Sequence, residues 1–498
     1  MTYTSKYPIM TPRTREIISL CAILIIVVFF CTFHIKESPP FWFDEGIYSQ
    51  AALNLTDLGV VGFQIAPGVI VKVPQLSIGY PLIYPLAGVF GMFGVGVLQA
   101  RLLMSLFILG TVLASYLLIR IIHGKTSALW MLFLLALFPP LYGTGKSVLG
   151  EVPGVFFFVL ALLFLSHAII SEHNWKRYLR IIGVGLCMGL VVATKTFFIT
   201  LIPAMVVLGI IYRKFLIAHI KEFTTGLISF AVPIVVWAFS QFESLDTLFS
   251  SLIFYSKPSG TNDVSVYILQ NIQNMFLDVG PFMLAGTMMI WLVSIFIRWN
   301  KKMPIHRAES FSFVFCSVSI LAFLRTAGYY RYLLPYQIIS LLFFPNALKV
   351  LADVAFQQIS AIKLVITRQV LLPTTFVIIG IFGGYQLLFN SWVADSYQSD
   401  KTRFWEEYFL NGIYKEPLFF YDVPEVAFFD HNRNYYQFIN MAPATGITAG
   451  GESVPILVAG IPGTVIVQTD DLGAVSPDLF TKYQSTEEVY KYTILEKL

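Results

Sequence analysis

Apolar residues recur along this chain in runs of roughly 20, the length that carries a helix across a bilayer core of about 30 Å. These runs predict about eleven membrane-spanning helices, which we place at residues 17–33, 97–120, 127–142, 152–170, 181–194, 197–212, 223–241, 281–298, 310–324, 329–348 and 370–390. The pattern is typical of an all-α polytopic membrane bundle, because a helix satisfies its own backbone hydrogen bonds in lipid.

The basic residues between these runs indicate which ends of the helices face the cytoplasm. If the N-terminus is cytoplasmic, more than half of the 33 lysines and arginines fall in segments on that side, and far fewer fall in the opposite loops. Since cytoplasmic loops carry an excess of lysine and arginine, this topology places loop 34–96, loop 143–151 and the residues after 391 on the extracytoplasmic side of the cell membrane.

Two of the extracytoplasmic segments are too long to be simple connectors. Loop 34–96 contains the apolar stretches Tyr48–Leu58 and Tyr80–Phe93, which are shorter than a span and predict helices lying at the membrane surface. After residue 391 charge returns, and short β-rich runs such as Pro455–Gly460 and Thr464–Thr469 predict a small α/β domain. We therefore expect a transmembrane domain at 1–391 and an extracytoplasmic domain at 392–498.

The composition agrees with a membrane protein and indicates which classes of partner to expect. Hydrophobic residues make up 56% of the chain and charged residues only 12%, against about a quarter in soluble domains. The net charge of +4 is spread over short loops, so we expect the lipid bilayer as a partner and no nucleic acid. The four cysteines all lie in apolar stretches, which predicts core packing and neither a disulfide framework nor a cysteine metal site.

The most distinctive polar feature is the acidic pair Asp44-Glu45, which follows the first predicted span within an aromatic stretch. Carboxylates among aromatic residues at a membrane surface are costly unless a cation, a metal or a substrate compensates their charge. One of the pair is therefore a candidate general base for an acceptor hydroxyl or amine, and the other would orient it or hold a metal. The structural alternative is a helix start, where carboxylates meet the helix dipole favourably.

A second acid, Glu151, begins a predicted span at the same extracytoplasmic end as Asp44. It is the only acid between Asp57 and Glu172, and Lys146 lies five residues before it. Two acidic positions at one end favour a shared site, to which Lys146 would add positive charge. A helix-start carboxylate is again the structural alternative.

Cations at the same end complete the candidate site. Lys195 interrupts an apolar stretch, and Arg331 lies among tyrosines at the outer end of a predicted helix, six residues after Arg325. Arginine binds phosphate oxygens bidentately and tyrosines suit the membrane interface, so Arg331 with Tyr330 and Tyr332 fits a lipid phosphate. Snorkelling towards lipid headgroups is the alternative for these cations.

The order of these elements resembles the GT-C superfamily of glycosyltransferases that use polyprenyl-phosphate sugars, and within it the aminoarabinose lipid A transferases and the protein O-mannosyltransferases. The resemblance rests on Phe43-Asp44-Glu45 with the following Tyr48, on the helix-start acid Glu151, and on Arg331-Tyr332-Leu333-Leu334-Pro335. It covers roughly residues 15–345, and we recognise no family motif after residue 391.

The resemblance implies roles for the three acids. Asp44 would be the base or a metal-coordinating acid, Glu45 its neighbour in the catalytic pair, and Glu151 the acid of the second loop. Some members of the superfamily use a divalent metal ion and others do not, and Asp44 and Glu151 would be its ligands here. No Gly-rich nucleotide loop is visible in the sequence, which agrees with a donor that carries no nucleotide.

The resemblance also implies how the donor is held and what reaction follows. The residues expected at the donor are cations for its phosphate and tyrosines that line the substrate, namely Lys146, Arg331, Lys195 and Arg325, and Tyr48, Tyr330 and Tyr332. An acceptor would attack the anomeric carbon of the sugar with inversion and displace polyprenyl phosphate, whose developing charge the cations would stabilise. The acceptor would be a lipid, a glycan or a protein hydroxyl.

Two other functions remain open from the sequence. An O-antigen-ligase-like transferase of a pyrophosphate-linked glycan would be expected to lack the early acidic pair and to rely on outer arginines and a histidine. A lipid or sugar transporter would place its polar residues near the bilayer midplane on broken helices. Here the charges gather at the outer helix ends, with the break at Lys195 as the exception.

Overall fold

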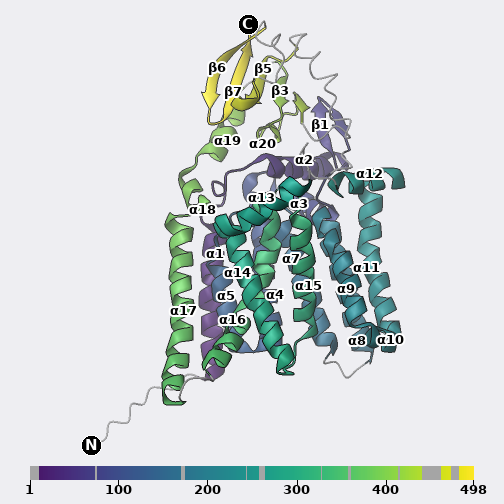
Figure 1. Ribbon diagram of the computed structural model, residues 1–498. Coiled ribbons are helices and arrows are strands. Elements are labelled where there is room, and N and C mark those ends of the chain that lie inside the picture. Colours follow the sequence, from purple (N-terminus) through teal and green to yellow (C-terminus); the bar gives the residue numbers. More distant parts are fainter. Residues whose placement is uncertain are drawn as a thin grey trace, which may run out of the picture.

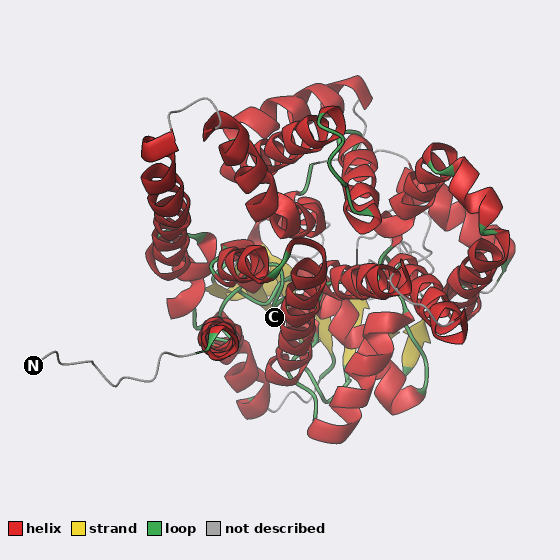
Figure 2. Ribbon diagram, turned by 90° about the horizontal axis from the view of Figure 1, so that it is seen from below, coloured by secondary structure: helices red, strands yellow, loops and turns green. Residues whose placement is uncertain are grey.

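The computed structural model describes residues 11–72, 76–169, 174–242, 244–256, 264–326, 328–356, 361–412, 416–439, 461–472 and 482–498. These residues form a helical bundle with a sheet at one end, and the first described helix, α1, begins at the opposite end (Figure 1). Viewed from that opposite end, the helices stand side by side and the strands lie behind them (Figure 2).

The helices of the bundle follow the apolar runs. Their bounds are α1 Pro12–Thr32, α4 Val97–His123, α5 Lys125–Ala136, α6 Pro139–Tyr142, α7 Glu151–Ile169, α8 Asn174–Thr194, η1 Thr196–Thr200, α9 Leu201–Ile211, α10 Arg213–Ala218, α11 Ile220–Gln241, α12 Leu245–Ser256, α13 Val264–Leu277, α14 Val279–Asn300, α15 Arg307–Phe323, η2 Tyr330–Leu333, α16 Leu334–Phe356 and α17 Ala361–Phe389.

Eight helices in the described part of the chain are long and apolar enough to cross a membrane, namely α1, α4, α7, α8, α11, α14, α16 and α17. Each of the eleven predicted spans overlaps a helix, so the all-α bundle is confirmed. The number of crossings is not, because α5 and the helical stretch Thr196–Ile211 are shorter than a typical span. Exposed apolar side chains on α11, such as Ile228 and Val232, are expected where a helix faces lipid.

Loop 34–96 folds at the sheet end of the bundle into two helices and a small hairpin. The helices α2 (Phe43–Leu58) and α3 (Tyr80–Phe93) correspond to the two predicted surface helices, and β1 (Phe63–Ala66) pairs antiparallel with β2 (Val69–Val71). Gly59 ends α2 with φ of 71°, a left-handed conformation that glycine adopts without strain. The helix α2 lies across the end of the bundle and carries the acidic pair in its first turn (Figure 1).

The residues after α17 form short helices and a five-stranded sheet, which confirms a small C-terminal sheet domain. The elements are α18 Trp392–Asp395, η3 Ser396–Gln398, α19 Lys401–Asn411, β3 Leu418–Tyr421, α20 Pro424–Ala427, β4 Tyr435–Phe438, β5 Thr464–Gln468, η4 Thr469–Asp471, β6 Tyr483–Val489 and β7 Tyr492–Lys497. The strand order is β4-β3-β5-β7-β6, with β3 parallel to both neighbours and β7 antiparallel to both of its own. The predicted run 464–469 coincides with β5, whereas 455–460 lies outside the described residues.

The C-terminal sheet domain packs on α2 through α20. A Cβ atom at Gly46 would lie 2.4 Å from the Glu425 backbone, so this approach requires glycine. Next along α2, the side-chain amide of Gln50 donates a hydrogen bond to the Pro424 carbonyl over 2.8 Å. The helix that carries the acidic pair is thus held between the bundle and the C-terminal domain.

We expect Gly46→Ala to lower the free energy of unfolding by roughly 1–3 kcal/mol, because the added methyl group overpacks the contact with Glu425. This loss should exceed the gain of about 1 kcal/mol that alanine brings to a helix. Thermal unfolding of the purified protein in detergent measures the change. Gly88→Ala in α3 is the matched control, since a Cβ atom there would meet nothing within 4 Å. Equal unfolding temperatures for Gly46→Ala and wild type would contradict the close contact.

Candidate active site

Asp44 and Arg331 form an ion pair at the sheet end of the bundle. Asp44 lies in the first turn of α2 and Arg331 in η2, and Arg331 Nη1 is 2.7 Å from Asp44 Oδ2. The guanidinium carbon also lies 4.5 Å from the centre of the Trp42 ring and 5.3 Å from that of Tyr329. The side chains of Asp44 and Arg331 are 18% and 16% exposed, so a ligand can reach both partners.

Glu151 and Lys195 form a second ion pair, which is buried. Lys195 Nζ donates a hydrogen bond to Glu151 Oε1 over 2.6 Å, and neither side chain is more than 3% exposed. The geometry depends on the break after Thr194, where the Lys195 backbone leaves α8 and pairs with Ile78. A Cβ atom at Gly150 would lie 2.9 Å from the Lys195 side chain, so the bare backbone there makes room for it.

Tyr332 joins the two pairs into one group, which we call the outer cluster (Asp44, Glu151, Lys195 and Arg331). The centre of the Tyr332 ring lies 5.2 Å from the Arg331 guanidinium carbon and 5.7 Å from Lys195 Nζ. Burial lowers the pKa of the Lys195 ammonium, and the charge of Glu151 opposes that shift. Glu151 Oε2 and Arg331 Nε have no hydrogen-bond partner among the described residues, so the charge-balanced cluster keeps polar capacity for a ligand.

Glu45 lies outside the outer cluster and is fully buried against α4. Its carboxylate accepts hydrogen bonds from Arg101 Nε and Nη2, at 3.2 and 2.9 Å, and from the Val148 backbone N–H at 3.1 Å. Arg101 Nη1 in turn donates to the Ile35 and Lys36 carbonyls, at 2.9 and 3.0 Å. Burial raises the pKa of the Glu45 carboxyl, while Arg101 and Val148 favour its charged form. These contacts make Glu45 a positioning residue for α2.

Lys146, expected from the sequence at the donor phosphate, belongs to this buried network instead. Its side chain is only 1% exposed, and Nζ donates a hydrogen bond to the Phe33 carbonyl over 3.1 Å. Burial and the nearby charge of Arg101 lower the pKa of Lys146 to about 7, although Glu37 and Glu45 act in the opposite direction.

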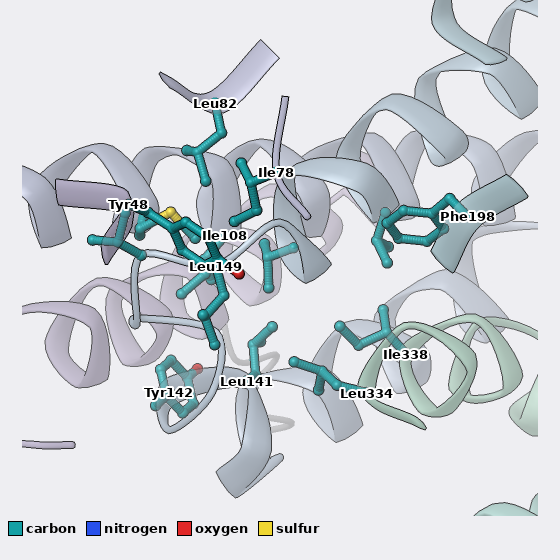
Figure 3. Close-up of a cluster of buried hydrophobic side chains, with 14 of the residues drawn as sticks. Tyr48, Ile78, Leu82, Ile108, Leu141, Tyr142, Leu149, Phe198, Leu334 and Ile338 are labelled. Carbon is teal, nitrogen blue, oxygen red and sulfur yellow. The ribbon is translucent and has the colours of Figure 1, made fainter. Parts of the chain in front are cut away.

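The remaining predicted residues, Tyr48, Tyr330 and Arg325, differ in their distance from the outer cluster. Tyr48 is buried in the hydrophobic cluster of Figure 3, with its hydroxyl 2.7 Å from Ser77 Oγ, so it packs beneath the site. Tyr330 is 42% exposed beside Arg331. Arg325 is exposed and forms no ion pair with a residue that the structure describes, which leaves it outside the outer cluster.

Trp42 and Arg101 have no role predicted from the sequence, yet Trp42 contacts Arg331 and Arg101 pairs with Glu45. Trp42 immediately precedes α2 and provides the ring under the Arg331 guanidinium. Arg101 is the only charged residue between Lys72 and Arg120, within an otherwise apolar span. A lone charge in a membrane helix usually has a specific partner, and this signal could have identified the pair with Glu45.

The predicted metal ligands do not form a metal site in the described part of the chain. No group of three or more His, Cys, Asp or Glu side chains there could hold a metal ion. Asp44 and Glu151 each face a cation already, so a divalent ion between them would meet the charges of Arg331 and Lys195. This set of donors does not fit a divalent metal.

Comparison with family models gives one match. Residues 81–239 match the family described as dolichyl-phosphate-mannose-protein mannosyltransferase. The matched stretch includes Glu151 and Lys195 but neither Asp44 nor Arg331. No match was found among curated proteins.

Solved structures share the fold over nearly the whole chain. ArnT from Cupriavidus metallidurans in the apo state aligns with 97% of this chain and 98% of its own, at 14% identity and a TM-score of 0.66. The same protein bound to undecaprenyl phosphate gives 97% and 98% coverage, 13% identity and a TM-score of 0.65. The Archaeoglobus fulgidus oligosaccharyltransferase tethered with an acceptor peptide aligns with 95% of this chain and 72% of its own, at 12% identity and a TM-score of 0.59. At these identities the likeness establishes the fold alone, while the family match over residues 81–239 agrees with the resemblance seen in the sequence.

Removing one partner of the Glu45–Arg101 pair should be costly. We expect Arg101→Ala to lower the free energy of unfolding by roughly 3–5 kcal/mol, because Glu45 would be left buried without its cation. The double variant Glu45→Leu/Arg101→Leu should lose much less, since neither member of the pair is left buried without the other. Thermal unfolding in detergent compares the three proteins. As a control, Arg403→Ala removes an exposed pair with Glu407 and should change stability by less than about 1 kcal/mol. An Arg101→Ala loss as small as the control's would contradict the pair.

Lys146 should make stability depend on pH. Its pKa is about 7 in the folded protein and near the ordinary 10.5 when unfolded, so the unfolded chain binds more protons between these values and stability rises with pH across that window. We expect Lys146→Met to be at least as stable as wild type at pH 6, and the difference between the two proteins to shift in favour of wild type as the pH rises towards 10. Unfolding temperatures across this range measure it, and parallel curves for the two proteins would rule out the lowered pKa.

Proposed function

We propose that this protein is an integral membrane glycosyltransferase that transfers a sugar from a polyprenyl-phosphate donor to an extracytoplasmic acceptor, with inversion at the anomeric carbon. The observation that carries the proposal is the outer cluster, where a partly exposed Asp44–Arg331 pair lies beside a buried Glu151–Lys195 pair. The ArnT structure bound to undecaprenyl phosphate, which shares this fold, supports a polyprenyl-linked donor. The acceptor would be a lipid, a glycan or a protein hydroxyl.

Arg331 and Lys195 would receive the phosphate of the donor. When the bond between the anomeric carbon and the phosphate oxygen breaks, its electron pair stays on that oxygen as negative charge. Cations already fixed beside the phosphate stabilise this charge without reorganising during the reaction. Arg331 suits the role because its planar guanidinium is held over Trp42 and because its Nε has no hydrogen-bond partner among the described residues. Glu151 would keep Lys195 charged and in place.

Asp44 would act as the general base. It takes the proton of the acceptor hydroxyl while the hydroxyl oxygen forms the new bond to the anomeric carbon, on the face opposite the departing phosphate. In the structure Asp44 is paired with Arg331. Since the donor phosphate competes with Asp44 for the guanidinium, donor binding would release the carboxylate for its catalytic role.

The proposal also includes the orientation of the bundle in the membrane and a role for the C-terminal domain. The excess of basic residues at the N-terminal end of the bundle supports a cytoplasmic N-terminus and an extracytoplasmic outer cluster. We take residues 1–391 as the transferase domain and 392–498 as an outer domain on the acceptor side. Its contact with Gly46, two residues from Asp44, supports a role in holding the base while the acceptor approaches.

We expect Asp44→Asn to reduce transfer at least 100-fold with donor binding retained, because the amide cannot accept the proton. Arg331→Ala should weaken donor binding and turnover together, by roughly 100-fold in kcat/KM, because the phosphate loses a charged donor. Transfer from radiolabelled polyprenyl-phosphate sugars by the purified protein in lipid, with several acceptors supplied, measures both effects.

The control for this assay is Arg403→Ala, which removes an exposed arginine paired with Glu407 and should leave transfer unchanged. Asp44→Asn with wild-type turnover would show that another group is the base. If wild type transfers no sugar from any donor to any acceptor, the glycosyltransferase assignment fails and transport becomes the better explanation.

A further inference from the structure

A cavity of about 580 Å³ opens at the end of the bundle opposite the outer cluster. It lies where α4, α7 and α14 end and α15 begins, beside the last turns of α16. Its polar lining is mostly basic or imidazole: His123, Arg298, His306, Arg307 and Lys349. The proposed transfer reaction does not use any of these groups.

The floor of the cavity contains Arg298, which forms a buried ion pair with Glu309 behind it. Arg298 Nη1 donates to Glu309 Oε2 over 3.0 Å, its Nη2 contacts the other carboxylate oxygen, and the indole N–H of Trp291 donates to Glu309 Oε1 over 3.1 Å. His123 Nε2 lies 3.5 Å from Glu309 without a hydrogen bond to any described residue. Since Glu309 neutralises Arg298 from behind, the charge that the cavity offers to a ligand comes from its rim.

The rim carries an excess of positive charge. Arg307 and Lys349 both line the opening, and the only acid in the lining is Asp353. The Arg307 guanidinium carbon lies 3.7 Å from the centre of the Phe215 ring, so stacking holds it in place while its N–H groups remain able to bind an anion. Two cations beside a mainly neutral floor give the mouth of the cavity a charge that suits a phosphate group.

Apolar surface continues from the opening along the bundle. Ile169 and Met303, both in the cavity lining, are 41% and 44% exposed. Exposed apolar side chains beside a basic pocket at a helix end suit a molecule with a charged head and a hydrocarbon tail. A free phosphate ion would use the cations but not this apolar margin.

We propose that the cavity binds the phosphate headgroup of an anionic lipid from the membrane leaflet at this end of the bundle. Arg307 and Lys349 hold the phosphate oxygens, the Arg298–Glu309 pair forms the floor, and the acyl chains lie along Ile169 and Met303. The site is separate from the outer cluster and does not depend on the function proposed for that cluster.

The test compares lipid binding by the full chain in non-ionic detergent, from shifts in unfolding temperature as dioleoyl-phosphatidylglycerol is titrated. Lys349→Ala removes an exposed cation and should weaken binding about fivefold, and Arg307→Ala/Lys349→Ala about 30-fold, at about 1 kcal/mol for each cation. Lys221→Ala, an exposed lysine at the same end outside the cavity lining, is the matched control and should bind like wild type.

Two further ligands identify the occupant. Dioleoyl-phosphatidylcholine should bind much more weakly, and binding as tight as that of phosphatidylglycerol would overturn the proposal. So would an Arg307→Ala/Lys349→Ala variant that binds phosphatidylglycerol like wild type, the result expected if the lipid instead occupies the outer cluster. Inorganic phosphate should give little shift alone. A phosphate shift equal to the lipid's, lost in the same double variant, would overturn the lipid assignment in favour of a free phosphate ion.

Discussion

The arrangement at the outer end of the bundle depends on the buried ion pair between Glu45 and Arg101. Each charge is tolerable in a dry interior only because the other is present, and the pair therefore fixes α2 against α4. The remaining N–H groups of Arg101 hold the chain between α1 and α2 through the Ile35 and Lys36 carbonyls. Adjacent residues of a helix point about 100° apart around its axis, so Asp44 faces away from Glu45 and pairs with Arg331.

The outer cluster shows how four charged side chains can be stable at the end of a membrane bundle. Its two carboxylates and two cations neutralise one another, which avoids the cost of burying an unpaired charge. The same pairs provide the groups that the proposed reaction needs, since a phosphate can replace Asp44 at Arg331. The stability of the cluster and its proposed role in donor binding would therefore have one physical origin.

The C-terminal domain adds a second constraint on α2 from the opposite side. Gly46 lets the α20 backbone approach closely, and Gln50 ties the next turn of α2 to Pro424. The helix bearing the proposed base is thus fixed by a buried ion pair on one side and by backbone packing on the other. At the other end of the bundle, the Arg298–Glu309 pair lies beside a basic cavity, with a neutralised arginine behind the cations Arg307 and Lys349.

The sequence alone predicted the membrane bundle, the helices of the first loop and the gathering of the distinctive charges at one end of the bundle. These features follow from run length, charge asymmetry and helix-breaking residues, which act locally. It could not separate Asp44 from Glu45, because adjacent carboxylates in one aromatic stretch have the same local chemistry. Nor could it show that Lys146 joins the buried network while Lys195 joins Glu151. Only the tertiary structure decided these partners, because burial and ion pairing depend on which distant segments meet, such as residue 44 with 331 and residue 45 with 101.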